Sequence, residues 1–180
     1  MNKKVLVLST SLRKNGNSDI LAENFIKGAL ESHNIVEKIS LIGKKIEFCV
    51  GCLSCQKTKK CVINDDMEKI VEKIKNSDVV VFATPIYYYE MSGQMKTLLD
   101  RTNPLFAGEY KFRDIYLLAT SADTEERAMD GALKGLEGWI ECFEKAILKG
   151  IVRGVGADTV GSIKKNEIAM KEAYEMGKNI

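Results

Sequence analysis

Residues 78–83 read DVVVFA, and this unbroken apolar run constrains the fold more than any other feature of the chain. A run of this length, rich in β-branched residues, is typical of a strand that is covered on both faces. Further strands are expected at residues 4–9, 35–41, 114–120 and 151–160, of which 4–9 is also a near-continuous apolar run. The sequence therefore predicts five buried strands.

Segments with helical spacing of apolar residues separate these runs. We expect helices at residues 17–32, 67–75, 92–102, 125–149 and 167–178. Strands that alternate with helices form parallel pairs joined by crossovers, so the prediction is a doubly wound α/β fold. We expect a five-stranded parallel sheet in three α/β/α layers, as one domain over residues 1–180. A cysteine-rich loop, residues 45–63, is inserted after the second strand.

Composition excludes several classes of protein. Hydrophobic residues make up 45% and charged residues 29% of the 180 residues, which is typical of a globular domain. A net charge of +2 gives no support for nucleic-acid binding, and no apolar run approaches the ~18 residues of a membrane span. The first residues form a strand and not an export signal, so we expect a cytoplasmic, reducing location. Clustered cysteines there indicate metal or redox chemistry rather than structural disulfides.

In a doubly wound sheet, ligands bind at the carboxyl ends of the strands. The loop after the first strand, STSLRKNGNSD at residues 9–19, is rich in hydroxyl groups and precedes a helix. Such a loop suits a phosphate, because helix N-termini offer free N–H groups and a positive dipole end. A plain turn, capped by Asn17 or Ser18, is the alternative. We take the following as the donors for an anion: Ser9, Thr10, Ser11, Arg13, Asn17 and Ser18.

The loops after the third and fourth long strands add two further features. Three consecutive tyrosines, Tyr87 to Tyr89, follow Pro85 and are suited to flank a flat aromatic ligand. Packing on neighbouring loops or a subunit contact is the alternative for these rings. Residues 120–126, TSADTEE, begin with small side chains that allow a ligand to approach the backbone.

Taken together, these loops resemble the NAD(P)H-dependent FMN reductases of the flavodoxin-like fold over nearly the whole chain. The motifs are S-x-R-K-x-G-N-S at residues 11–18, P-I-Y at 85–87 and K-x-x-x-D-R at 96–101. The sequence departs from the common Gly-Ser-Pro-Arg loop, since Leu12 stands where many members have proline.

The resemblance implies three groups of residues around FMN. The flavin phosphate would lie against Ser11, Arg13, Asn17 and Ser18, with Ser9 beside them. The isoalloxazine ring and ribityl chain would lie against Pro85, Ile86, Tyr87 and Tyr88. The pyrimidine side would face Thr120, Ser121 and Ala122.

Within that family, the cysteine loop resembles that of the iron-sulfur flavoproteins, with its C-x2-C-x2-C-x5-C spacing. This resemblance implies a [4Fe–4S] cluster bound by Cys49, Cys52, Cys55 and Cys61. Three alternatives stay open: structural zinc, a reversible disulfide, or a contact loop without a ligand. The acidic pair Asp65 and Asp66 is interpreted as helix capping, and Cys142 as a buried core thiol.

The sequence thus predicts an enzyme, an NAD(P)H-dependent FMN reductase. It would pass electrons from NAD(P)H, or from a reduced ferredoxin-like iron-sulfur protein, through FMN to a small acceptor such as a quinone, nitroaromatic or free flavin. No catalytic side chain is expected, because the flavin carries the chemistry and the only histidine, His33, lies at a helix end. The alternatives are a flavodoxin-like or iron-sulfur electron carrier and a cysteine-based sensing module. By resemblance we expect a homodimer or homotetramer, with residues 87–91 and the cysteine loop as candidate contacts.

Overall fold

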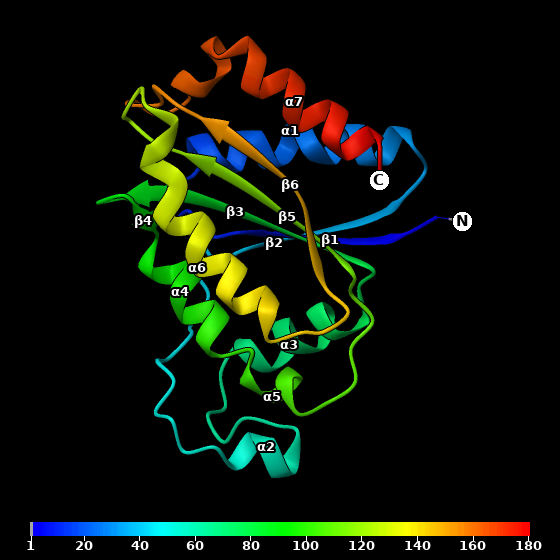
Figure 1. Cartoon of the computed structure of the whole chain (residues 1–180). Coiled ribbons are helices and arrows are strands. Elements are labelled where there is room, and N and C mark those ends of the chain that lie inside the picture. Colours follow the sequence, from blue (N-terminus) through cyan, green and yellow to red (C-terminus); the bar gives the residue numbers. More distant parts are fainter. Residues whose placement is uncertain (1) are drawn as a thin grey trace.

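A twisted parallel sheet forms the centre of the molecule. The computed structural model describes residues 2–180, which form a six-stranded sheet in which the parallel strands follow the order β2-β1-β3-β5-β6 and the short β4 pairs antiparallel with β3 (Figure 1). This is the flavodoxin-like order. The strands are β1 (Lys4–Ser9), β2 (Ile35–Ser40), β3 (Val79–Tyr87), β4 (Glu90–Met91), β5 (Asp114–Thr120) and β6 (Ile147–Gly154).

Helices cover both faces of this sheet. α1 (Asn17–Glu31) and α7 (Glu167–Lys178) lie on one face. The other face carries α3 (Met67–Asn76), α4 (Gly93–Asp100) and α6 (Asp130–Glu141). The short helices are α2 (Ser54–Thr58), α5 (Asn103–Phe106) and the 3-10 turns η1 (Glu126–Met129) and η2 (Ser162–Lys165). The predicted three-layer α/β/α fold is confirmed. Among the described residues, no helix is both long and apolar enough to cross a membrane.

Alternation along β3 explains why both layers form. Val79, Val81 and Ala83 are fully buried against α1 and α7, while Val80 and Phe82 are fully buried on the opposite side. Successive side chains of a strand point to opposite faces, so a continuous apolar strand requires cover on both. The run at residues 78–83 therefore dictates the layered architecture.

The segment before the last strand corrects one prediction. Residues 125–149 were expected to be one helix, but α6 ends at Glu141. The last strand, expected at residues 151–160, begins earlier, at Ile147, and ends at Gly154. Ile147 pairs with Asp114, at the start of β5. β6 is an edge strand and only partly buried, so its first half, ILKG, lacks the unbroken apolar run that identifies the central strands.

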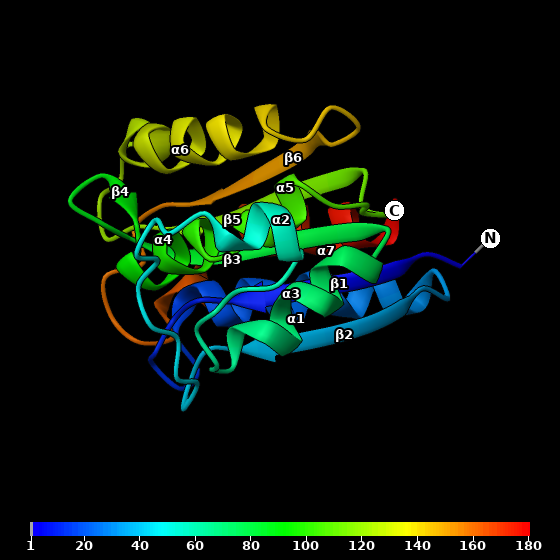
Figure 2. The ribbon, with the colours of Figure 1, turned by 90° about the horizontal axis from the view of Figure 1, so that it is seen from below.

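The cysteine loop (residues 45–63) extends from the sheet beyond the α3 and α5 layer. Figures 1 and 2 show α2 and its flanking segments beside α5, on the side of that layer that faces away from the sheet. Because of this placement the cysteines are remote from the sheet, but they lie at the end of α4 where Arg101 follows the helix.

Candidate functional site

The three predicted loops meet at the carboxyl edge of the sheet. Hydrogen bonds join the first two, because Thr10 donates from its N–H (2.9 Å) and from its hydroxyl (3.0 Å) to the carbonyl of Ala83. The Thr10 hydroxyl also lies 3.2 Å from Oγ of Ser92, the residue that caps α4. The Tyr89 hydroxyl donates to Asp123 at 3.0 Å and joins the second loop to the third. The edge is therefore one connected surface.

The N-terminus of α1 is prepared for an anion. No side chain within the described residues caps this helix, so its first N–H groups are open. Ser18 lies in the first turn, is 1% exposed, and its hydroxyl has no hydrogen-bond partner among residues 2–180. Asp19, the acidic residue of this turn, is paired with Lys38 at 2.6 Å, which reduces its repulsion of an anion. The exposed Arg13 adds a cation in the same loop. These features fit a phosphate group.

Three other predicted phosphate residues have structural partners. The Ser9 hydroxyl donates to Asp19 at 2.7 Å, and Oγ of Ser11 accepts from the N–H of Arg13 at 3.2 Å. The Asn17 amide donates to the carbonyls of Ala157 (3.0 Å) and Thr159 (2.8 Å) and accepts from the N–H of Ile163 (3.2 Å). The side chain of Asn17 thus ties the loop after β6 to α1, and its contribution to a ligand would come from its backbone.

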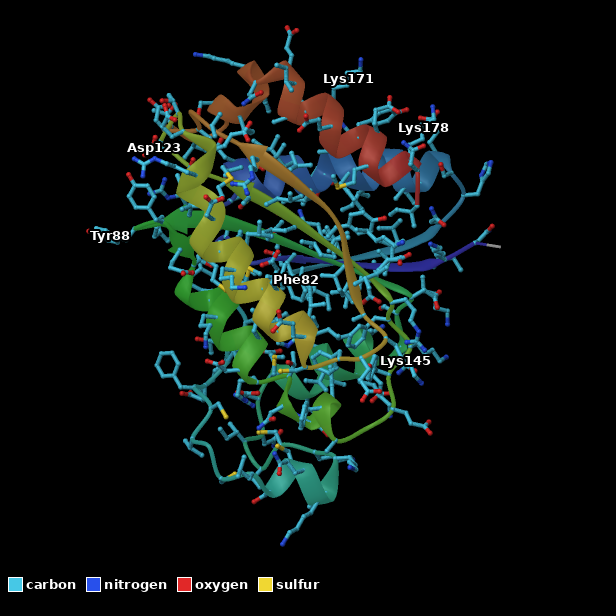
Figure 3. The ribbon with its side chains drawn as sticks, viewed as in Figure 1. Phe82, Tyr88, Asp123, Lys145, Lys171 and Lys178 are labelled. Atoms are coloured by element: carbon cyan, nitrogen blue, oxygen red, sulfur yellow. The ribbon has the colours of Figure 1, made fainter. Side chains whose placement is uncertain are left out.

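The tyrosine turn extends into solvent beyond the sheet edge. Tyr88 is fully exposed and Tyr87 is 48% exposed, and Figure 3 shows Tyr88 directed away from the body of the molecule. Tyr88 and Tyr89 adopt left-handed backbone angles, with φ of 51° and 64°. Such strain in bulky residues is concentrated at functional sites. Before this turn, Pro85 and Ile86 are half-buried at the end of the parallel part of β3.

The third loop carries two small hydroxyl residues and a carboxylate. Thr120 and Ser121 are 4% exposed, whereas Ala122 is exposed. The Ser121 hydroxyl donates to the carbonyl of Asp123 at 3.0 Å. Hydrogen bonds from the N–H of Glu125 and the Tyr89 hydroxyl lower the pKa of Asp123, so its carboxylate is charged at neutral pH.

The cysteine loop brings its four thiols around one hollow. Cys49, Cys52, Cys55 and Cys61 line this hollow, and Asp100, Arg101 and Pro104 close it from the α4–α5 side. Cys55 is 7% exposed, and burial followed by the neighbouring thiolates raises its pKa. The N–H and hydroxyl of Ser54 lower the pKa of Cys52.

Two kinds of metal site use four thiolates. A tetrahedral zinc ion takes its four sulfurs around one centre, whereas a [4Fe–4S] cube binds each thiolate to a different iron. Within residues 2–180, no three histidine, cysteine or acidic side chains lie close enough together to hold a single metal ion. The four cysteines at one hollow provide the thiolates that either group uses.

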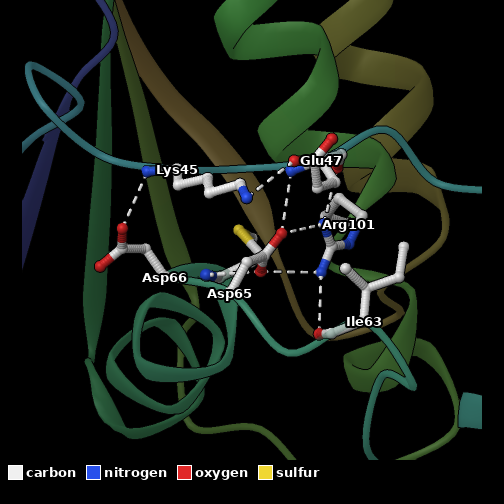
Figure 4. Close-up of polar contacts among 7 residues, drawn as sticks. Lys45, Glu47, Ile63, Asp65, Asp66 and Arg101 are labelled. Atoms are coloured by element: carbon white, nitrogen blue, oxygen red, sulfur yellow. Dashed lines mark hydrogen bonds and ion pairs between the residues drawn. The ribbon is translucent and has the colours of Figure 1, made fainter.

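A buried ion pair at this hollow was not predicted. Arg101 and Asp65 have side chains that are both 1% exposed, with Nη1 of Arg101 2.6 Å from Oδ2 of Asp65 and Nη2 3.0 Å from Oδ1 (Figure 4). Burial alone would raise the pKa of Asp65, but hydrogen bonds from Arg101 and from backbone N–H groups lower it. Asp65 also accepts a hydrogen bond from the N–H of Met67, the first residue of α3. It therefore contributes to capping as predicted, but its main partner is Arg101. The one feature of the sequence that could have indicated this ion pair is the charged dipeptide Asp100-Arg101, which follows the apolar residues of a helix.

The prediction for the fifth cysteine is wrong. Cys142 is exposed at the C-terminal end of α6, whereas Phe143 beside it is 3% exposed and fills the core position. The helix ends here, so its 3.6-residue period no longer decides which side chain is buried.

Comparison with known proteins agrees with these features. An iron-sulfur flavoprotein of Methanocaldococcus jannaschii is 36% identical over 105 residues, which is 58% of this chain and 54% of that protein. One of Archaeoglobus fulgidus is 37% identical over 101 residues, 56% of this chain and 46% of that protein. The chain thus spans about half the length of these curated relatives. YwqN of Bacillus subtilis, whose name describes an NAD(P)H-dependent FMN-containing oxidoreductase, is 28% identical over 96% of both chains.

Solved structures show the same fold. An NAD(P)H:quinone oxidoreductase from Methanothermobacter marburgensis has a TM-score of 0.75 at 16% identity, over 99% of this chain and 97% of that one. An FMN-dependent NADH-azoreductase from Bacillus anthracis, solved in complex with FMN, has a TM-score of 0.73 at 16% identity over 98% of both. Residues 3–146, four fifths of the sequence, match the NADPH-dependent FMN reductase family, and the chain belongs to that family.

Proposed function

We propose that the protein is an FMN-dependent oxidoreductase that passes electrons from NAD(P)H to a small acceptor such as a quinone, nitroaromatic or free flavin. The main support is the buried Ser18 hydroxyl, which has no partner among residues 2–180 and lies at the open N-terminus of α1. A buried polar group without a partner is costly unless a ligand completes it. This position is where a flavin phosphate would be held.

Each loop would have a distinct role around the cofactor. Ser18 and the first N–H groups of α1 hold the phosphate, and Arg13 pairs with it from solvent. Thr120 and Ser121 place hydroxyl oxygens beside the polar edge of the ring, while the backbone groups of Ser121 are bonded to Gly154 and Ala157. Tyr87 borders the space for donor and acceptor, whereas Tyr88 is directed into solvent. Bound FMN supplies the redox chemistry, while the protein binds and orients the reactants.

The phosphate assignment can be tested by ligand titration of flavin-free protein. We expect Arg13→Ala and Ser18→Ala to weaken FMN binding about tenfold or more, as loss of a hydrogen bond to a charged group implies. Riboflavin, which has no phosphate, should bind the variants and the unchanged protein equally. Lys14→Ala is the matched control, because Lys14 is an exposed cation in the same loop. Equal weakening for Lys14→Ala, or for riboflavin, would contradict the assignment.

We propose in addition that the cysteine loop binds a [4Fe–4S] cluster. The support is the hollow that the four cysteines share and the iron-sulfur flavoprotein names of several relatives. A cluster would allow a one-electron donor, such as a reduced ferredoxin-like protein, to serve this chain alongside NAD(P)H.

Iron and sulfide analysis after anaerobic purification tests this second proposal. The unchanged protein should hold about four irons per chain, and Cys52→Ser should lose most of the iron and sulfide. Cys142→Ser, in the exposed thiol outside the loop, should lose none. Protein that contains zinc, or neither metal nor sulfide after reconstitution, would exclude the cluster.

A further inference from the structure

Arg101 is unusual because it is charged and yet has the largest fully buried side chain among the described residues. It is 1% exposed and lines the hollow of the four cysteines. Burial of a charge is unfavourable unless it is paired and hydrogen-bonded. Its contacts therefore show which groups depend on it.

The guanidinium fastens both ends of the cysteine loop. Nη1 donates to the carbonyl of Glu47 at 2.6 Å, two residues before the first cysteine, and Nη2 makes a longer contact of 3.5 Å to the carbonyl of Ile63, two residues after the last. Asp65 holds the guanidinium in a bidentate pair and accepts from the N–H of Glu47 at 2.8 Å. One ion pair thus closes the base of the loop (Figure 4).

One donor of this guanidinium is left over. Nε of Arg101 has no hydrogen-bond partner among residues 2–180, although it is buried. Arginine has five N–H groups, and those on Nη1 and Nη2 are directed to Glu47, Ile63 and Asp65. Arg101 and the four cysteines line the same hollow. Sulfur is therefore the acceptor that this hollow offers to the buried Nε–H.

We propose that Arg101 is a positioning residue of the cysteine site, which closes the loop and donates its Nε–H to sulfur of the bound cluster or of its cysteine ligands. This inference rests on the proposed cluster. A cation and an N–H donor beside the sulfurs favour the reduced form, which is the more negative one. Arg101 therefore raises the reduction potential of the cluster.

The reduction potential provides the first test. Replacement of Arg101 alone leaves Asp65 as an unpaired buried carboxylate, so the main variant is the double change Asp65→Asn with Arg101→Met. We expect its potential to fall, with a tenfold or larger shift in the oxidised-to-reduced ratio at fixed potential, about 59 mV for a one-electron couple. Arg101→Lys, which keeps the charge but loses Nε, should fall less.

Lys57→Gln is the matched control for this titration. It removes one positive charge from the same loop, but at an exposed position where solvent screens it. We expect a shift below twofold in the same ratio. A double variant that loads the cluster and titrates like the unchanged protein, monitored by electron paramagnetic resonance, would overturn the role of Arg101 and leave the cluster standing.

Limited trypsin digestion of chelator-treated, metal-free protein tests the closure of the loop independently of the cluster. Cleavage after Lys57, Lys59 and Lys60 should be at least tenfold faster in the double variant, while cleavage elsewhere in the chain keeps its rate. Equal rates within the loop would overturn the closure. If the unchanged protein binds no iron or sulfide, the donation to sulfur fails together with the cluster, and digestion still decides the closure.

Discussion

At the scale of single residues, the buried ion pair of Arg101 and Asp65 should make the stability of the protein sensitive to one substitution. Arg101→Met leaves the Asp65 carboxylate buried without its cation, and we expect a loss of about 3–5 kcal/mol in the free energy of unfolding. Adding Asp65→Asn should recover a large part of this loss, because no unpaired charge is left. Urea unfolding of the two variants measures the difference. A double variant less stable than the single one would show that the pair itself, and not the orphaned charge, governs stability.

The same pair predicts how stability depends on pH. The pKa of Asp65 is lowered on folding, so its contribution is complete above the ordinary carboxyl pKa of about 4 and is lost as pH falls through the lower, folded-state value. We expect the melting temperature to fall below about pH 4, and to fall less steeply in the variant that carries Asp65→Asn and Arg101→Met. Thermal melts between pH 6 and 2.5 check this, and parallel curves would contradict it.

The role of a residue could be predicted where the residue belongs to a sequence motif. It could not be predicted where only the tertiary structure brings two distant residues together. The cysteine spacing is visible in the sequence, and the four thiols do line one hollow. Asp65 and Arg101 are 36 positions apart, and neither shows its partner locally. Cys142 lies close in sequence to Trp139 and Phe143, which predicts a buried thiol, although the end of α6 exposes it.

At the scale of elements, the contact between α1 and α7 depends on two glycines. A Cβ on Gly28 would lie 2.0 Å from the carbonyl oxygen of Tyr174, and a Cβ on Gly177 would lie 2.0 Å from that of Phe25. The two helices therefore approach each other with backbone against backbone. The two helices together form the layer that covers one face of the sheet.

Gly28→Ala should consequently destabilise the protein by about 1–3 kcal/mol, since the helices must move apart to admit the methyl group. Gly138→Ala is the matched control, because Gly138 lies inside α6 and a Cβ there meets open space. We expect this control to gain up to about 1 kcal/mol from helix propensity. Denaturant unfolding compares the two, and equal stability of both variants would contradict the close approach.

Most strands could be located from the sequence to within a few residues. β1, β2 and β5 agree with the predicted ranges to within one residue, although β2 lies at an edge, and β3 continues past the predicted end at Ala83 to Tyr87. β6 lies at the edge and begins with Lys149 and Gly150 among its first four residues, so its start was placed too late. The two-residue β4 is too short to leave a pattern at all.

The whole molecule exposes aromatic rings at one end, where the sequence predicts a contact between two copies of the chain. Tyr88 is fully exposed and Tyr87 and Tyr89 are about half exposed, on the strained turn between β3 and β4. Exposed apolar groups gathered on one projection are typical of interaction sites. The turn also adjoins the candidate flavin edge, so a second copy would close that edge.

Light scattering after size exclusion tests this contact. Tyr88→Glu should raise the dimer dissociation constant about tenfold or more, since a charge in an apolar contact is costly. Ile168→Glu is the matched control, because Ile168 is 73% exposed on α7, in the helix layer on one face of the sheet, whereas β4 beside the turn contacts α6 and η1 on the other. A monomeric unchanged protein, or equal loss for both variants, would contradict the prediction.

Helix α4 also fixes the distance between the candidate flavin edge and the cysteine hollow. Its N-cap, Ser92, is bonded to Thr84 and Thr10 at the flavin edge, and Arg101 follows its last residue at the cysteine hollow. Insertion of one residue between them would lengthen the helix by about 1.5 Å and turn Arg101 by about 100° away from Asp65. Substitutions can alter either end of α4 independently, but an insertion or deletion would disconnect one end from its partners. Descendants of this chain are therefore free to vary the composition of this helix far more than its number of residues.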